Sequence, residues 1–282
     1  MSARLTEVMD SRPSMIVTSD QIAQFRSAGF VSFPRLIDGG TLDTLRAAYD
    51  ELIEVGARGD GSLDRRLGGL TRQIMRPECS HAAFHHNNPA CTNALEGTRA
   101  LTGWKDPGFY YSQLLYKPPG HPHATPWHQD VAYGAMPFVA PGTRQPRFML
   151  TFWVALDDAD EDNGCMHFYP QVHGGETLPH RVAAGDCEDE GRMLALVHDE
   201  WMDTSQVACC PIPAGGATVH DASTLHFTPA NKSNRARRAY IVCIAESGFL
   251  RSLRSRSRVT TARSRAHTWA RELVALAKKP FR

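Results

Sequence analysis

The sequence predicts a β-rich α+β fold in which antiparallel strands form a jelly-roll core and helices pack outside it. Apolar residues recur at helical spacing in the N-terminal part of the chain. From about residue 108, short runs of β-branched and aromatic residues follow one another. Turns rich in Gly, Pro and Asn, such as PPG, DEDNG and PANKSN, separate these runs. Helices followed by many short strands are typical of a β-sandwich or jelly roll with external helices.

The N-terminal elements are predicted to be two helices that flank a strand. Thr18 can cap a helix over QIAQFRSAG, and Gly29 ends it, because glycine is favoured just after a helix C-terminus. FVSFPRL (30–36) follows as a strand. In GGTLDTLRAAYDELIEV (39–55), leucines and Tyr49 recur on one side, which predicts a second helix whose apolar stripe packs against the core.

The predicted core strands come next, and one long irregular segment interrupts them. Residues 174–205 are rich in charge and poor in periodicity, which indicates a long loop of the kind that borders a substrate site. The predicted strands are FYYSQLLYK (109–117), RFMLTFWVAL (147–156), GCMHFYP (164–170), GATVHDASTLHFT (216–228) and RAYIVCIAES (238–247).

Composition indicates a soluble globular protein with an unevenly charged chain. Of 282 residues, 42% are hydrophobic and 22% charged, and the net charge of +1 favours neither a nucleic-acid nor a membrane partner. Residues 251–282 nevertheless hold ten Lys and Arg and a single acidic residue. We therefore predict one domain over residues 1–250 and a basic helical tail over residues 251–282. The tail either docks on the acidic body or holds phosphates of a CoA- or carrier-bound substrate.

Targeting signals and cysteine usage point to a cytoplasmic location. The N-terminal segment lacks the apolar region of a secretory signal, and no stretch reaches 18 apolar residues. The seven cysteines show no C-x-x-C spacing, so we interpret them as reduced thiols.

One short motif suggests a metal site. PWHQDVAYGAM (126–136) places His128 two residues before Asp130. Residues i and i+2 of a strand point to one face, so both side chains could reach one ion, although the pair could equally lie on the surface without a metal. Two histidines and one carboxylate form the facial triad of non-haem Fe(II) oxygenases. The third ligand would be a later histidine, and the strand-like run 216–228 offers His220 and His226.

The segment LHFTPANKSNRARRA (225–239) resembles the end of the phytanoyl-CoA dioxygenase family of Fe(II)/2-oxoglutarate oxygenases. That family shows a histidine followed by Asn at five residues, a hydroxyl residue at seven and Arg at eleven. The register excludes His220 as the family ligand. The matching residues here are His226, Asn231, Ser233 and Arg237. The resemblance runs from about residue 18 to 247 and includes DQIAQFRSAGFVSFPRLID (20–38), QLLYKPPGHPHATPWHQD (113–130) and LTFWVALDDADEDNGCMHFYP (150–170).

The chain departs from the family pattern at PQVH (170–173), where relatives usually carry Pro-Gly-Ser-His. That loop borders the site, so the departure bears on substrate choice rather than on iron binding.

The resemblance implies a double-stranded β-helix that binds Fe(II), 2-oxoglutarate and O2. The far carboxylate of 2-oxoglutarate needs a buried cation, and arginine suits it because its planar fork matches a carboxylate. Arg238 is adjacent to this arginine, so it should face the other way and carry a solvated charge. The implied iron ligands are His128, Asp130 and His226, and the implied 2-oxoglutarate contacts are Gln113, Trp153, Thr228 and Arg237.

The implied activity is hydroxylation of an unactivated C–H bond in a small molecule, such as an acyl compound or specialised metabolite, with release of succinate and CO2. Chlorinating relatives replace the ligand carboxylate by Gly or Ala, so Asp130 predicts no halogenase activity. Two alternatives stay open: a non-redox, cupin-like metal protein, and a catalytically inactive binding protein. Aromatic and apolar candidates for a substrate wall are Tyr111, Tyr133, Met136, Phe138 and Trp201.

Overall fold

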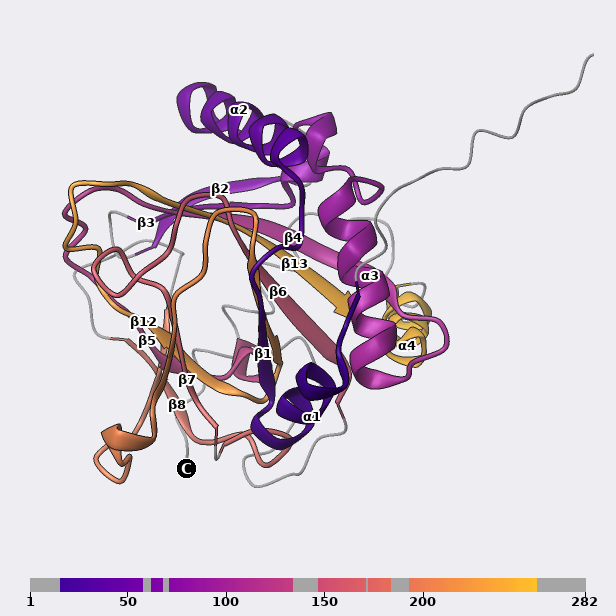
Figure 1. Cartoon of the computed structure of the whole chain (residues 1–282), viewed down its shortest axis with the longest axis vertical. Coiled ribbons are helices and arrows are strands. Elements are labelled where there is room, and N and C mark those ends of the chain that lie inside the picture. The colour runs from indigo at the N-terminus through magenta and orange to yellow at the C-terminus, as the bar shows by residue number, and fades with distance from the viewer. Residues whose placement is uncertain are drawn as a thin grey trace, which may run out of the picture.

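The computed structural model describes residues 16–57, 62–67, 71–133, 147–170, 172–183 and 193–257. Within them, a seven-stranded sheet with the order β1-β11-β6-β13-β4-β3-β2 faces a four-stranded sheet with the order β10-β7-β12-β5 (Figure 1). A two-stranded sheet, β8-β9, lies beside them. Every pairing among these strands is antiparallel. The architecture is therefore β-rich, as the sequence predicted.

The strands of the large sheet are the longer ones. They are β1 (Phe30–Phe33), β2 (Leu63–Leu67), β3 (Thr71–Met75), β4 (Gly108–Lys117), β6 (Met149–Ala155), β11 (Ala217–Asp221) and β13 (Arg237–Ala245). The small sheet contains β5 (Thr125–His128), β7 (Met166–Tyr169), β10 (Ala208–Cys210) and β12 (Leu225–Thr228), and the third sheet contains β8 (His180–Val182) and β9 (Leu194–Leu196).

Helices α1 to α3 contribute apolar side chains to the core on the outer face of the large sheet (Figure 1). Thr18 caps α1 in a capping box with Gln21, and Gly29 ends the helix at a φ of 77°. Both predicted helices are confirmed. The helices are α1 (Ser19–Ala28), α2 (Gly39–Val55), α3 (Pro89–Thr102) and α4 (Ser247–Ser257), with 3-10 turns η1 (Pro77–Cys79), η2 (Ala82–Phe84), η3 (Asp130–Tyr133) and η4 (Thr204–Gln206).

Alternation along β13 divides the interior into two layers. Tyr240 and Val242 belong to the cluster that packs against the helices. Ala239, Ile241 and Cys243 belong to the cluster between the two sheets. Side chains of one strand thus serve both layers, because successive residues point to opposite faces. The inter-sheet layer is the one that contains the candidate site.

The segment 216–228 is not one strand, as the sequence suggested. Instead, β11 ends at Asp221 and β12 begins at Leu225, in the opposite sheet. The Asp221 carboxylate accepts hydrogen bonds from the Ser223 backbone N–H (2.8 Å) and hydroxyl (2.7 Å), which turns the chain between the sheets. The Gly29 carbonyl also accepts bonds from the Asp221 N–H (3.0 Å) and the Thr224 hydroxyl (2.9 Å).

Several elements were not predicted. They are α3, the β2–β3 hairpin, and the short strands β8 and β9 inside the expected loop 174–205. Helix α3 did carry local signals: Asn88 accepts a bond from the Cys91 N–H, Pro89 opens the helix, and Gly103 ends it.

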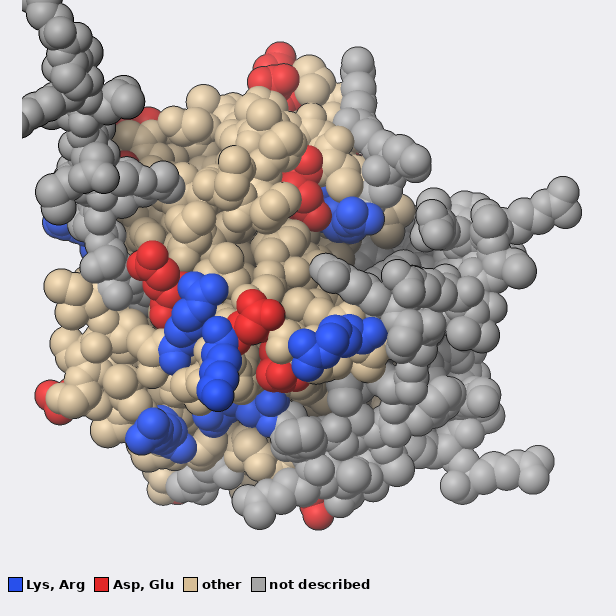
Figure 2. Space-filling model, turned by 90° about the vertical axis from the view of Figure 1, so that its right-hand side faces the viewer, with Lys and Arg blue, Asp and Glu red and all other residues tan. Residues whose placement is uncertain are grey.

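Helix α4 crosses the boundary predicted at residue 250, and residues 258–282 of the expected tail lie outside the described residues. None of the helices in the described part of the chain is long and apolar enough to cross a membrane. Figure 2 shows the side of the molecule that lies at the right in Figure 1, and acidic and basic side chains are interspersed on it. The described part of that face therefore presents no continuous field of one sign.

Candidate active site

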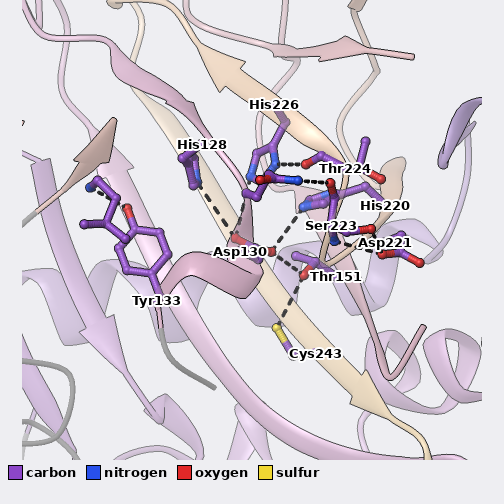
Figure 3. Close-up of polar contacts among 12 residues, drawn as sticks. His128, Asp130, Tyr133, Thr151, His220, Asp221, Ser223, Thr224, His226 and Cys243 are labelled. Atoms are coloured by element: carbon purple, nitrogen blue, oxygen red, sulfur yellow. Dashed lines mark hydrogen bonds and ion pairs between the residues drawn. The ribbon is translucent and has the colours of Figure 1, made fainter. Parts of the chain in front are cut away.

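Three predicted ligands converge between the two sheets (Figure 3). His128 and His226 are cross-strand partners on β5 and β12, with ring centroids 4.1 Å apart. Oδ1 of Asp130 lies 3.8 Å from Nε2 of His128 and 3.6 Å from Nε2 of His226. One detail of the expectation is wrong: β5 ends at His128, and Asp130 opens η3. The turn still aims the carboxylate at the two imidazoles.

Both histidines are held with the same nitrogen facing the site. Nδ1 of His128 lies 2.7 Å from the Pro126 carbonyl, and Nδ1 of His226 lies 2.9 Å from the Thr224 carbonyl. A carbonyl can only accept, so each Nδ1 carries the proton and each Nε2 keeps its lone pair. Burial lowers the pKa of both rings, which favours the neutral form that binds metals.

Asp130 is oriented by two residues of the large sheet. Its Oδ2 accepts a hydrogen bond from the Thr151 hydroxyl (2.7 Å) and lies 3.3 Å from Nε2 of His220. Thr151 on β6 and His220 on β11 are register partners, so the two donors act side by side. Burial raises the pKa of Asp130, but His226 and His220 lower it by more, and it lies below its ordinary value. The carboxylate is therefore ionised.

These three side chains fit a divalent metal ion. Two neutral imidazole nitrogens and one ionised carboxylate oxygen approach a common point from one side, which is the donor set of the facial triad. His220 lies outside this group: its Nε2 faces the far oxygen of Asp130, and its ring centroid lies 4.3 Å from that of His226. Sequence reasoning had no role for Thr151. The signal available was a hydroxyl residue inside the apolar strand MLTFWVA, where a buried polar group needs a partner.

The residue between the first two ligands is also structural. The Gln129 side chain is buried; its amide nitrogen donates to the Ser223 carbonyl (2.7 Å), and its oxygen accepts from the Leu178 N–H (2.8 Å). His180 on β8 receives the Gln129 backbone N–H. This residue therefore links the ligand turn to the segment expected to border the substrate.

Two buried cations face each other across the large sheet. Arg237 and Lys117 are register partners on β13 and β4, and both side chains are almost fully buried. Among the residues that the structure describes, no carboxylate lies within ion-pair distance of either one. Within the same described residues, Nε and Nη1 of Arg237 have no hydrogen-bond partner. Because an unpaired buried charge is costly, this pair marks a pocket for an anion.

The remaining predicted pocket residues lie on the same inner face. The Arg237 guanidinium lies 5.1 Å from the Trp153 ring centroid. The Lys117 ammonium donates to Oγ1 of Thr228 (3.0 Å) and to the Pro229 carbonyl (2.8 Å). Gln113 aligns with Ile241, four residues from Arg237 along β13, and its side chain accepts a bond from Gln73.

Lys117 is the last residue of β4, and its side chain is fully buried. Burial, with a further contribution from Arg237, lowers the Lys117 pKa well below its ordinary value. Arg238 does face away from the pocket, but it is not a solvated charge. Its side chain is 18% exposed and forms ion pairs of 2.7 Å with both Asp50 and Asp157.

The proposed substrate wall is only partly assembled. The Tyr133 ring lies edge-on to His128, with centroids 5.6 Å apart, and Tyr111 is partly buried beside Cys243. Trp201 is 50% exposed and packs against Tyr169. Met136 and Phe138 lie outside the described residues.

Comparison with known proteins places this geometry in a family. The family model of phytanoyl-CoA dioxygenase (PhyH) matches residues 25–239. The chain is 29% identical over 201 residues to a probable alpha-ketoglutarate-dependent hypophosphite dioxygenase of Stutzerimonas stutzeri, covering 67% of this chain and 65% of that protein. It is 26% identical to phytanoyl-CoA dioxygenase domain-containing protein 1 of Bos taurus, covering 82% and 91%. With the Caenorhabditis elegans homologue of that protein, the match covers about half of each chain, 51% and 48%.

Solved structures show the same likeness. EvdO2 from Micromonospora carbonacea var. aurantiaca, complexed with 2-oxoglutarate, superposes with a TM-score of 0.65 at 28% identity, covering 82% of this chain and 92% of that one. The epimerase SnoN, solved with Fe3+, alpha ketoglutarate and nogalamycin RO, shares the fold at a TM-score of 0.59 and 22% identity, covering 81% and 83%. The family match spans most of the chain and includes all three converging ligands and Arg237, so the chain belongs to the phytanoyl-CoA dioxygenase family.

Proposed function

We propose that this chain is an Fe(II)- and 2-oxoglutarate-dependent dioxygenase that hydroxylates an unactivated C–H bond of a small molecule on a double-stranded β-helix. One observation carries the proposal: a His-Asp-His group and a buried arginine with two unpartnered nitrogens share one inter-sheet space. A metal site alone would fit many reactions. A metal site beside an unpaired buried cation fits a co-substrate that has one chelating end and one carboxylate end.

Each residue has a stated role in this proposal. His128, Asp130 and His226 would hold Fe(II), and Thr151 and His220 keep the Asp130 carboxylate turned toward it. Fe(II) bound by these ligands would supply the oxidising power for a reaction that consumes O2 and 2-oxoglutarate and releases succinate and CO2. The protein's own contribution is orientation, a preorganised charge and exclusion of water.

The 2-oxoglutarate pocket would lie toward the other end of the inner face. Arg237 would pair with the far carboxylate through its free Nε and Nη1. Lys117 holds Thr228 so that the hydroxyl stays near that carboxylate. Trp153 and Gln113 would form the remaining walls.

Hydroxylation is the proposed outcome, and halogenation is not, because Asp130 supplies the carboxylate ligand. The relatives named above include a probable hypophosphite dioxygenase and, at an identity that shows the fold alone, an epimerase. We propose a small-molecule substrate, one catalytic domain over residues 1–250, a carrier- or CoA-binding role for the basic residues after it, and a cytoplasmic location.

The test combines a spectrum with a stoichiometry. Fe(II) and 2-oxoglutarate added without O2 should give a metal-to-ligand charge-transfer band in the wild type and none in His226→Ala. Admission of O2 should then release succinate in proportion to O2 consumed. Metal binding without 2-oxoglutarate turnover would support a non-redox cupin-like protein, and absence of the band would support an inactive binding protein. Either result would overturn the proposal.

A further inference from the structure

A second group of metal-ligand side chains lies on the small sheet. In the described part of the chain, the ligand atoms of Cys165, His167 and Cys209 all lie within 4.8 Å of one another. The two sulfurs are 3.5 Å apart. His167 on β7 and Cys209 on β10 are register partners, so two paired strands bring the group together. The proposed active site uses none of these residues.

Strand alternation puts His167 on the face of the small sheet opposite the iron ligands, whereas Cys165, just before β7, is fully buried. Phe168, the next residue after His167, points inward, where its ring lies 6.3 Å from that of His226. His167 therefore points outward, and its ring packs edge-on to Phe227 at 5.6 Å. Cys209 shares that side, whereas the neighbouring Cys210 pairs with Met166 and contacts Ser32 of the large sheet. The small sheet thus separates His167 and Cys209 from the iron ligands.

The donors are already arranged as ligands. Nδ1 of His167 lies 3.2 Å from the Cys165 carbonyl and must donate to it, which leaves Nε2 with a free lone pair. The exposed Glu161 carboxylate lies near the Cys209 thiol, outside the group of three, and is available as a fourth ligand. Glu161 lies in a turn that internal bonds fix, including Cys165 N–H to the Asp160 carbonyl at 2.8 Å.

We propose that Cys165, His167 and Cys209, with Glu161 as the fourth ligand, form a binding site for Zn2+ or another thiophilic divalent ion. Two sulfurs, one imidazole and one carboxylate are a tetrahedral donor set that favours Zn2+. With Zn–S bonds of about 2.3 Å, tetrahedral geometry separates two sulfurs by about 3.8 Å, so the observed spacing needs little change.

The proposal has a proton balance. Each cysteine carries its thiol proton before a metal binds, because the ordinary pKa of a cysteine thiol lies above neutral pH. Binding of one divalent ion forms two metal–sulfur bonds and releases two protons, with no oxidation or reduction. A disulfide would instead need an oxidant, and it would leave His167 and Glu161 without a function.

The ion would stabilise the edge of the small sheet. Strand β10 is an edge strand of three residues that pairs with β7 alone. A metal bridge between these strands would fix β10, and through the His167–Phe227 contact it would steady β12, which carries His226. The site is therefore structural in role and independent of the proposed oxygenase chemistry.

The experiment uses Co2+ as the probe on reduced, metal-stripped full-length protein. One equivalent should give intense thiolate-to-cobalt charge-transfer absorption, because the iron site offers only nitrogen and oxygen donors. The band should persist in Asp130→Ala, which removes an iron ligand, and in Cys210→Ser, the adjacent cysteine on the opposite face. It should vanish in Cys165→Ser and Cys209→Ser and weaken in His167→Gln. Zn2+ added to the metal-free protein should release two protons per ion, and Zn2+ added to the cobalt form should displace the cobalt without further proton release.

Three results would overturn the proposal. The first is that wild-type protein gives no thiolate-to-cobalt band although a thiol assay under reducing conditions shows that all its cysteines are reduced. The second is a band that is lost in Cys210→Ser but kept in Cys209→Ser. The third is loss of two reactive thiols on isolation, recovered by reductant and unaffected by chelator, which would make the pair a disulfide. A thermal unfolding curve for each variant distinguishes a lost ligand from a lost fold.

Discussion

The two sheets contribute different kinds of residues to the site. The small sheet, with strands of three or four residues, supplies the two histidine ligands. Nδ1 of each histidine donates a hydrogen bond to the backbone carbonyl two residues earlier in the chain. The large sheet supplies Thr151, His220, Lys117 and Arg237 from long paired strands. Local turns therefore orient the metal ligands, whereas long-range strand register places the groups that hold the carboxylate and receive an anion. Mutations on the two sheets should accordingly fail in different ways.

The largest effect is expected on the small-sheet side. His226→Ala and Asp130→Ala should reduce turnover below detection, because each removes one of three ligands to the proposed iron. The fold should be retained, since both sheets pack around extensive apolar clusters that exclude these side chains. Succinate release and circular dichroism measure the two properties. His220→Ala is the control and should keep substantial activity. An inactive His220→Ala variant together with an active His226→Ala variant would mean that His220, not His226, is the third iron ligand.

Arg237→Ala should give the largest effect on the large-sheet side. It removes the partner of a buried anion, which typically costs about 2–5 kcal/mol, so the KM for 2-oxoglutarate should rise roughly 30-fold or more. Arg237→Lys should restore this only in part, because an ammonium cannot pair with both carboxylate oxygens in one plane. Unchanged KM in both variants would remove the main support for 2-oxoglutarate as co-substrate.

A smaller effect is expected where the large sheet contacts the ligand carboxylate. Thr151→Val and His220→Ala each remove one of two partners of Oδ2 of Asp130. Loss of such an outer contact should weaken iron binding by about tenfold, the low end of the usual range, because the second partner remains. Iron titration should show the shift, and activity should be substantial at saturating iron. A tenfold loss that excess iron does not restore would contradict a positioning role.

Arg238→Ala should change the KM for 2-oxoglutarate least, by less than about threefold, because the side chain faces Asp50 and Asp157 rather than the pocket. Its ion pairs join β13 to α2 and to the loop after β6, so the unfolding midpoint should fall while the KM stays nearly constant. A large rise in KM for Arg238→Ala, with none for Arg237→Ala, would mean that Arg238 rather than Arg237 faces the pocket.

Sequence reasoning reached the residues that short-range spacing defines. His128, Asp130, His226 and Arg237 stand in motifs with constant intervals, and the structure brings the first three together and buries the fourth. The partners of those residues could not be found in this way. Thr151, His220 and Lys117 acquire their positions from which strands are neighbours, and that order is set by tertiary packing.

The segment 216–228 shows the same limit. Its β-branched and apolar residues are typical of one strand, yet Asp221 and Ser223 form a turn that carries the chain from one sheet to the other. Local polar bonds overrode the strand pattern there. As a result, His220 and His226, six residues apart, stand on facing walls of the site.

The contacts of Gly29 with that turn bear on the order in which the protein folds. Its carbonyl bonds to Asp221 and Thr224, and a Cβ at this position would come within 2.6 Å of the Thr224 hydroxyl oxygen. The Thr224 carbonyl in turn accepts a hydrogen bond from Nδ1 of His226. The position of this ligand, near the end of the domain, therefore depends on contacts with the junction between the first helix and the first strand. Closing a loop of nearly two hundred residues is slow. Metal competence should therefore arise late during refolding, and a charge-transfer signal that preceded the far-ultraviolet signal would contradict this.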